Sequence, residues 1–188
     1  MADLTLTPSP PLDGYDRDFG HLRLRAPPGL ALVALAFPTG GEDAARAAIT
    51  KNCDADLPAP GRYTAAPDGT RLIWMAPDLI FAAFEDAAPD AADRMAQRLG
   101  EAVRVTDQSD GWVALSAEGA GVCRALERIC PLDLHPEAFP PDAAQRTVME
   151  HLGVLILCTG ADAFLLLSAS SSAESFRHAL EVSAANTG

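Results

Sequence analysis

The sequence has little that would place it in a membrane or carry it across one. No apolar run approaches the roughly 20 residues that span a bilayer. The longest candidates, residues 29–37 and 152–158, have the length of buried strands. The N-terminus reads MADLTLTPSPPLDG and lacks the basic stretch and apolar core of a signal peptide. We therefore expect a cytoplasmic protein that does not enter a membrane.

Basic residues are also scarce, with 14 Lys and Arg against 26 Asp and Glu and a formal net charge of -12. Such a charge repels a phosphate backbone and the anionic face of a membrane, which argues against both as partners. The 48% hydrophobic and 21% charged content is typical of a folded globular chain. A chain of 188 residues can bury a core as one domain or as two small subdomains.

Metal-binding spacings are missing as well. No CxxC or HxxxH occurs, whereas zinc sites use cysteines two to four residues apart. The one close pair, Cys123 and Cys130, is predicted to lie on one helix with the sulfurs about 10 Å apart along its axis. We expect all four cysteines to fill the core in a reducing compartment: Cys53, Cys123, Cys130 and Cys158. The histidines fall in separate elements without a second ligand nearby: His21, His135, His151 and His178.

Signatures of nucleophilic catalysis and nucleotide binding are absent too. The sequence has no GxSxG, GxGxxG or Walker-type motif, and the glycines of residues 119–121 have no lysine to hold a phosphate. Ser171 is expected to cap a helix. Glu150 and His151 are predicted to be adjacent on a strand, where their side chains would point to opposite faces. We therefore predict no catalytic, cofactor-binding or metal-binding residue in this chain.

What the sequence does contain is an alternation of strand and helix patterns. Residues 21–25 and 30–37 read as strands. A helix follows, with Thr39 and Glu42 at the spacing of a capping box. Residues 54–70 are rich in Pro, Gly, Ala and Asp, which predicts a long loop. Two more strands, RLIWM and LIFAAF, and a helix that begins at Asp90 complete this part.

A second copy of the same order follows. AVRVT and WVALSA read as strands on either side of a turn that holds Asp107 and Asp110. The third helix ends at Pro131. RTVMEHLGVLILC and AFLLLSA are predicted to form a hairpin, and Ser171 with Glu174 is expected to cap the last helix.

The order strand, helix, strand, strand, helix thus occurs twice, with a repeat distance of roughly 80 residues. We predict an α+β fold of two duplicated subdomains, residues 21–100 and 101–188, with helices on one face of each sheet. The strands of residues 22–25 and 102–106 could complete either half. Residues 1–20 are predicted to be a tail or an arm whose apolar side chains could lie along a partner: Leu4, Leu6, Leu12, Tyr15 and Phe19.

Residues 70–180 resemble the gamma subunits of heterotetrameric sarcosine oxidase. RLIWMAPDLIFA is similar to two apolar strands of that family joined by a Gly-Pro-Asp turn, with Ala76 in place of the glycine. CPLDLHPEAFPP, residues 130–141, is the most specific similarity. The chain departs from the family at residues 170–173, which read SSSA, and at Arg177 and Ala179, where tryptophans are common.

The resemblance implies a fold related to the folate-binding module of aminomethyltransferases, with two subdomains that exchange a strand. It also implies a non-catalytic gamma subunit whose alpha, beta and delta partners carry FAD, FMN, NAD, tetrahydrofolate and zinc, while this chain binds none of them. In that family the complex oxidises sarcosine to glycine, releasing a one-carbon unit as formaldehyde or methylenetetrahydrofolate together with hydrogen peroxide. The resemblance also offers a second interpretation of Asp107, as a remnant of a folate-contacting carboxylate, beside its favoured role in the turn. Two alternatives stay open: a stand-alone folate-dependent one-carbon transferase or folate-binding protein, and a stand-alone binding protein for a small acid.

Overall fold

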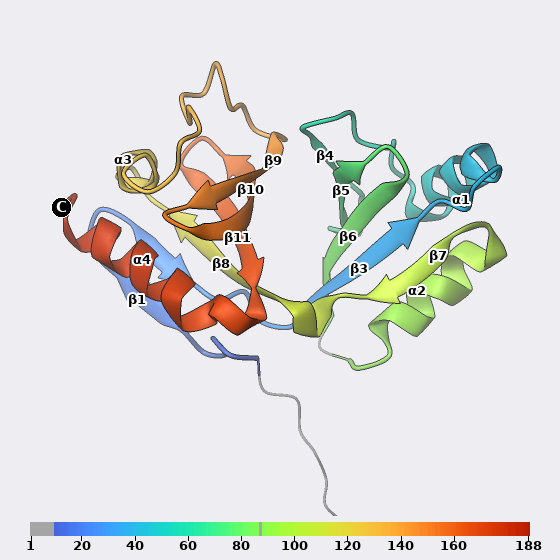
Figure 1. The fold of residues 1–188 in the computed structure, drawn as a ribbon, viewed down its shortest axis with the longest axis horizontal. Helices are drawn as coiled ribbons and strands as arrows, with labels where there is room; N and C mark the ends of the chain where they lie inside the picture. Colours follow the sequence, from blue (N-terminus) through green and yellow to red (C-terminus); the bar gives the residue numbers. More distant parts are fainter. Residues whose placement is uncertain (1–9, 87) are drawn as a thin grey trace, which may run out of the picture.

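The computed structural model describes residues 10–86 and 88–188, which form two α+β lobes side by side (Figure 1). The first lobe is built on a six-stranded antiparallel sheet. Its strands are, in spatial order, β1 (Asp16–Asp18), β2 (Arg23–Arg25), β8 (Trp112–Glu118), β11 (Ala163–Ala169), β10 (Leu152–Gly160) and β9 (Ala144–Met149). Helices α3 (Val122–Leu126) and α4 (Ala173–Ala185) cover its outer face.

The second lobe has a five-stranded antiparallel sheet with two helices on its outer face, α1 (Glu42–Cys53) and α2 (Ala91–Leu99). Its strands are, in spatial order, β4 (Tyr63–Ala65), β5 (Arg71–Ala76), β6 (Leu79–Glu85), β3 (Leu30–Ala36) and β7 (Arg104–Asp107). Three short 3-10 helices occur at Gly100–Ala102, Ser109–Gly111 and Ser170–Ser172. None of the helices within residues 10–86 and 88–188 has both the length and the hydropathy that a membrane crossing requires.

The internal duplication is present, and each copy has one more strand than predicted. The first copy runs β3, α1, β4, β5, β6, α2, and the second runs β8, α3, β9, β10, β11, α4. The extra strand of the first copy, β4, has three residues and lies inside the segment predicted to be a loop. In the second copy, β9 and β10 were predicted as one strand, because the turn between them contains neither Gly nor Pro.

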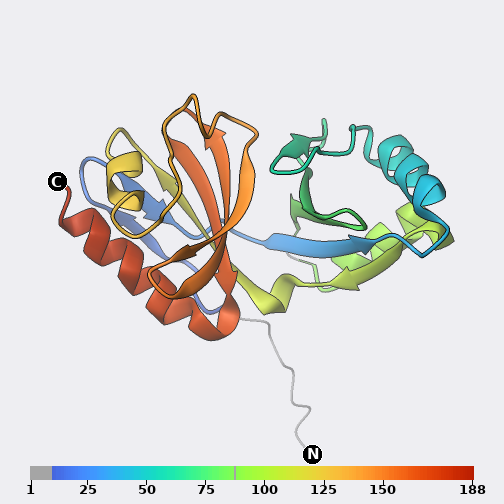
Figure 2. The ribbon, with the colours of Figure 1, turned by 45° about the horizontal axis from the view of Figure 1, so that its top comes forward.

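The two lobes exchange a strand. β2 precedes the first copy but pairs with β8 of the second, with Leu24 opposite Ala117. β7 precedes the second copy but pairs with β3 of the first, with Ala34 opposite Thr106 (Figure 2). The predicted boundary between residues 100 and 101 therefore does not coincide with the division between the two sheets. Sequence pattern could not place these short strands, because pairing partners are chosen by tertiary contacts.

Three apolar layers form the core, one inside each lobe and one between the two sheets. Leu35 of β3 and Ile49 of α1 lie in the layer between the five-stranded sheet and its helices. Leu115 of β8 and Phe176 of α4 lie in the corresponding layer of the other lobe. The third layer lies between the two sheets, and ten residues have their side chains fully or almost fully buried there: Leu32, Ala34, Ile73, Phe81, Ala83, Ala144, Leu155, Leu157, Leu165 and Leu167. Both faces of each sheet are thus covered, which explains why β3 and β10 read as continuous apolar runs.

Residues 10–20 correct the prediction of an arm. They form a turn and strand β1, which adds to the edge of the six-stranded sheet beside β2. Leu12 is buried in the core of that lobe, and Tyr15 and Phe19 pack against the same core. These three apolar side chains therefore contact their own chain. Leu4 and Leu6, the other side chains of the tail or arm that could lie along a partner, lie outside the described residues.

Neither predicted capping box forms. Helix α1 begins after Gly41, and the Glu42 carboxylate accepts a hydrogen bond from the Gly40 N–H (3.0 Å) in place of a cap from Thr39. Helix α4 begins after Ser172, without a side-chain cap from Ser171. In both cases the helix starts later than the spacing predicted, so the Ser or Thr lies outside the first turn.

Candidate functional site

The cysteines have the environment of core residues. Cys53, Cys130 and Cys158 are buried and Cys123 is partly buried, and all four are free thiols. Helix α3 ends at Leu126, so Cys130 lies beyond it and does not share a helix with Cys123, contrary to the prediction. Burial raises the pKa of the Cys53, Cys123 and Cys158 thiols, which opposes the thiolate that a nucleophile or a metal ligand needs.

Among the described residues, no group of three or more His, Cys, Asp or Glu side chains is arranged to hold a metal ion. Three of the histidines, His135, His151 and His178, are exposed and lie in three different segments: the loop after α3, the turn between β9 and β10, and helix α4. The fourth, His21, is held by the chain itself: its Nδ1 lies 3.1 Å from the Phe19 carbonyl and its Nε2 lies 3.2 Å from Thr187 Oγ1.

The glycines of residues 119–121 make room for the backbone and ring of His21. A Cβ on Gly119 would lie 2.6 Å from the His21 carbonyl oxygen, and one on Gly121 would lie 2.2 Å from the His21 ring. Gly119 also has a φ of 129°, in the region that favours glycine. The pair therefore serves close packing at the turn from β8 into α3.

Glu150 and His151 lie in the tight turn between β9 and β10, not on a strand as predicted. Met149 pairs with Leu152 across this turn, and Glu150 has a φ of 53°. Both side chains are exposed. The predicted turn at Asp107 is confirmed, because its Oδ1 accepts a hydrogen bond from the Ser109 N–H (2.9 Å), and both Asp107 and Asp110 are exposed.

The densest polar cluster joins the N-terminal segment to α4. The Tyr15 hydroxyl donates a hydrogen bond to Glu181 Oε1 (2.8 Å), and Arg17 and Arg177 form ion pairs with the same carboxylate at 3.2 and 2.8 Å. Burial, followed by the bond to Glu181, raises the pKa of Tyr15. Burial alone would raise the pKa of Glu181, but the three hydrogen-bond donors hold it below its usual value. Every charge in the cluster has a partner, so the cluster fixes the N-terminal segment to α4, and it is called here the N-terminal joint.

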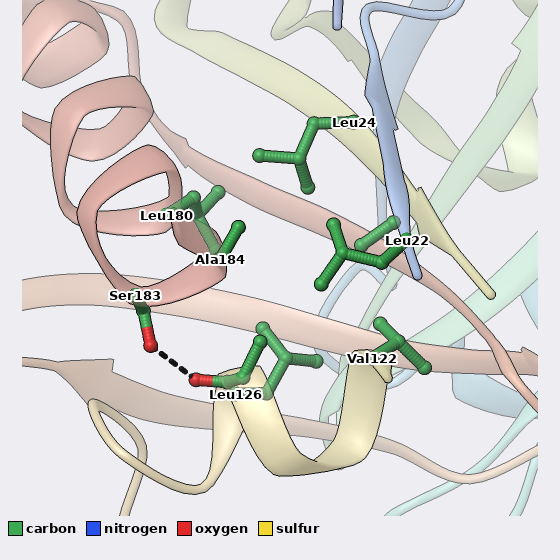
Figure 3. A pocket seen from close by; sticks show the side chains of 9 residues that line it. Leu22, Leu24, Val122, Leu126, Leu180, Ser183 and Ala184 are labelled. Atoms are coloured by element: carbon green, nitrogen blue, oxygen red, sulfur yellow. Dashed lines mark hydrogen bonds between the residues drawn. The ribbon is translucent and has the colours of Figure 1, made fainter. Parts of the chain in front are cut away.

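A small cavity lies in the core of the first lobe, between α3, α4 and the strands (Figure 3). It measures about 10 Å³ and is lined mostly by apolar side chains from β2 and the residue before it, β8, α3 and α4, among them Leu22, Leu126 and Leu180. Its polar neighbour, Ser183, donates its hydroxyl proton to the Ala125 carbonyl (2.6 Å). A space of this size holds at most about one water molecule, so it is a packing gap rather than a ligand site.

A larger hollow is a groove of about 400 Å³ on the surface of the second lobe. It is called here the α1 groove, and it is bounded by α1, the β5–β6 hairpin and the loop before β4. Ten residues line it: Phe37, Arg46, Leu57, Pro58, Ala59, Pro60, Trp74, Ala76, Pro77 and Ile80. The lining is mostly apolar, with a single charged side chain, Arg46.

The groove is shaped by a β-bulge and by a fixed cation. The pairing of β5 with β6 shifts between Trp74 and Ala76, and such an irregularity changes the direction of the side chains beside it. The Arg46 guanidinium lies 5.1 Å from the centre of the Phe37 ring and donates a hydrogen bond to the Pro77 carbonyl (3.0 Å). No residue of this groove was predicted from sequence to bind anything, although Trp74-Met-Ala-Pro77 and the Pro58-Ala-Pro60 loop are its visible signals.

A family model for the sarcosine oxidase gamma subunit matches residues 39–186, which is most of the chain. The chain belongs to the sarcosine oxidase gamma subunit family. It is 32% identical to the gamma subunit of sarcosine oxidase from Corynebacterium sp. (strain U-96) over 161 residues, 84% of this chain and 71% of that subunit. The gamma subunits from Arthrobacter sp. and Corynebacterium sp. (strain P-1) are 31% and 30% identical, and this chain spans 53% and 58% of their length.

Solved structures support the same family. The heterotetrameric sarcosine oxidase from Corynebacterium sp. U-96, in complex with pyrrole 2-carboxylate, contains a chain that matches 88% of this chain and 85% of its own length. The TM-score is 0.78 at 28% identity. Aminomethyltransferase T of the glycine cleavage system from Bartonella henselae has a TM-score of 0.62 at 16% identity, over 85% of this chain and 45% of that enzyme. This second likeness shows a shared fold and confirms the aminomethyltransferase-like α+β architecture.

Proposed function

We propose that this chain is the non-catalytic gamma subunit of a heterotetrameric sarcosine oxidase, in which it assembles with alpha, beta and delta subunits. The complex would oxidise the N-methyl group of sarcosine, releasing glycine, a one-carbon unit as formaldehyde or methylenetetrahydrofolate, and hydrogen peroxide. The observation that carries the proposal is the similarity over 88% of this chain to a chain of the Corynebacterium heterotetramer. If this chain occupies the same place in a similar complex, its fold should match that subunit over nearly its whole length, as it does here.

In this proposal FAD, FMN, NAD, tetrahydrofolate and zinc belong to the partner subunits. The donor groups of this chain suit that division. The Cys53 and Cys158 thiols are held in the protonated form by a raised pKa, His21 is bonded within its own chain, and the clustered carboxylate Glu181 is neutralised by arginines. These groups are engaged in holding the fold rather than in binding an electron carrier.

Co-expression with the three partner subunits, followed by size-exclusion chromatography, tests the proposal. We expect the chain to elute with the partners in one complex that oxidises sarcosine. Elution of this chain as a free monomer beside a complete alpha, beta and delta assembly would contradict it.

A titration calorimetry experiment separates this function from the folate-binding alternative. The isolated chain is titrated with tetrahydrofolate, and we expect no heat of binding at high micromolar ligand. The likeness to aminomethyltransferase T extends to the fold alone, so it does not by itself predict folate binding. Saturable binding would favour a folate protein instead.

A further inference from the structure

We propose that the α1 groove is the docking site for an extended segment of a partner subunit that presents a carboxylate beside a large apolar side chain. This inference rests on the proposed function, because it supposes that the chain works inside a complex. It assigns a particular surface and a particular chemistry to that assembly.

The internal duplication shows what the same place looks like when it is filled. The β5–β6 and β10–β11 hairpins have the same irregularity two residues before the turn, so Trp74 opposite Ile80 corresponds to Cys158 opposite Phe164. In the second half, Phe139 stacks on Phe164 with ring centroids 6.4 Å apart, and both rings are buried. The corresponding space is therefore closed by the protein's own side chains.

In the first half the corresponding residues border the α1 groove. The loop before β4 and the loop before β9 contain equivalent hydrogen bonds, from Arg62 N–H to the Ala59 carbonyl and from Ala143 N–H to the Pro140 carbonyl. Ala59 therefore corresponds to Pro140, and the preceding residue Pro58 corresponds to Phe139. A stacked pair of phenylalanines is thus replaced by Pro58 and Ile80, both of which line the groove. The missing ring volume, the half-buried Trp74 and a volume of about 400 Å³ fit an apolar side chain supplied from outside.

The charge of the groove indicates the second part of the occupant. Its lining contains the Arg46 cation and no carboxylate, on a chain whose net charge is -12. One guanidinium nitrogen of Arg46 is bonded to the Pro77 carbonyl and the group lies over the Phe37 ring, which fixes its position. A guanidinium has five N–H donors, so others remain for a carboxylate at the groove. Electrostatic complementarity therefore selects an acidic residue next to the apolar one.

The walls of the groove are rigid, which favours a docking role. Pro58, Pro60 and Pro77 have fixed φ angles and no N–H donors. A preformed groove orders few of its own side chains when a partner binds, so less of the interaction energy is lost to conformational entropy. An extended segment can place alternate side chains into such a groove while its backbone runs along the rim.

The first test compares two charge reversals on helix α1. Arg46→Glu reverses the cation of the groove, and Lys51→Glu makes the same change on an exposed residue of the same helix that does not line the groove. Each variant is co-expressed with the alpha, beta and delta subunits and analysed by size-exclusion chromatography and by a binding titration. We expect Arg46→Glu to weaken assembly by at least about tenfold and Lys51→Glu to leave it unchanged.

The possible outcomes separate this inference from the proposed function. If the wild-type chain assembles and Arg46→Glu assembles equally well, or if both variants lose assembly to the same extent, the groove is not the docking site. If the wild-type chain itself does not assemble, the proposed function fails and the inference fails with it. Circular dichroism melting of the isolated variants checks that neither substitution unfolds the chain.

A photocrosslinking experiment tests the chemistry of the occupant. A photoreactive phenylalanine analogue replaces Trp74 in the co-expressed complex, and the crosslinked peptide is identified by mass spectrometry. We expect a peptide of a partner subunit with Asp or Glu within about two residues of a large apolar side chain, spacing that one extended segment can place in the groove. Reversal of that acidic residue to Lys should restore assembly of Arg46→Glu. A crosslink to a peptide without such a pair, to a small molecule, or to no partner within an intact complex would overturn the proposal.

Discussion

Glu181 is the residue whose ionisation matters most for the N-terminal joint. Its folded pKa lies below the ordinary 4.5, so the carboxylate contributes stability that is present above pH 4.5 and is lost as the pH falls through the lower folded value. We expect Glu181→Gln to lower the free energy of unfolding by roughly 1–2 kcal/mol at neutral pH. The difference from wild type should shrink as the pH falls below 4.5 and through the lower folded pKa of Glu181, because the protonated Glu181 is then neutral like the glutamine. Urea denaturation at several pH values measures this.

Glu174 provides the control for that experiment, because it forms its ion pair with Arg177 at the surface, where it is largely exposed. Glu174→Gln should change stability by less than about 0.5 kcal/mol. An equal loss in both variants, or a loss for Glu181→Gln that does not depend on pH, would show that the joint is not electrostatic.

Phe139 stacks on Phe164 in the second copy of the duplication, where the two rings fill the space that corresponds to the α1 groove. Replacing it with Ala removes a buried ring that stacks on Phe164 and leaves a hollow like the one beside Pro58. We expect a loss of about 3–5 kcal/mol in the free energy of unfolding, measured by chemical denaturation. Ala138→Gly, at the exposed neighbouring position, should cost about 1 kcal/mol or less. A loss of similar size for both would mean that the loop backbone, and not the ring, carries the stability.

At the scale of elements, the turn from β8 into α3 leaves no room for a side chain at Gly119. Gly119→Ala would place a Cβ 2.6 Å from the His21 carbonyl oxygen in a left-handed conformation, so we expect a loss of roughly 2–4 kcal/mol. Gly153→Ala in strand β10 is the matched control, because a Cβ there meets nothing within 4 Å. Thermal unfolding of the two variants should separate them clearly. Comparable melting temperatures would contradict the close approach.

The long elements were predictable from sequence and the short ones were not. Helix α2 was predicted to begin at Asp90 with Gly100 just past its end, and it runs Ala91–Leu99, because apolar spacing and a terminal glycine agree there. The strand pattern around Glu150 was misread, because no Gly or Pro interrupts it and the turn depends on a non-glycine residue with positive φ. The capping boxes failed for a similar reason, since helix starts shift by a few residues with tertiary packing.

At the scale of the whole molecule, the exchanged strands should make folding a single event. The predicted boundary at residues 100 and 101 separates β7 from β3, and it also leaves β2 on a different fragment from β8. We expect residues 1–100 and 101–188, expressed separately, to show no cooperative unfolding, and their mixture to recover it at least in part. Calorimetry and circular dichroism measure both. A sharp transition in either fragment alone would contradict this expectation.

The sequence by itself determined the composition of the fold: two copies of an α+β unit, apolar runs that had to be buried strands, and the absence of familiar catalytic spacings. These are properties of local order, which periodicity and turn chemistry report directly. Only the tertiary structure decided which sheet β2 and β7 join, and that Leu12, Tyr15 and Phe19 pack on their own chain. It also decided that one half is closed by Phe139 while the other leaves the α1 groove open. Such features arise from residues far apart in sequence that become neighbours only in the packed fold.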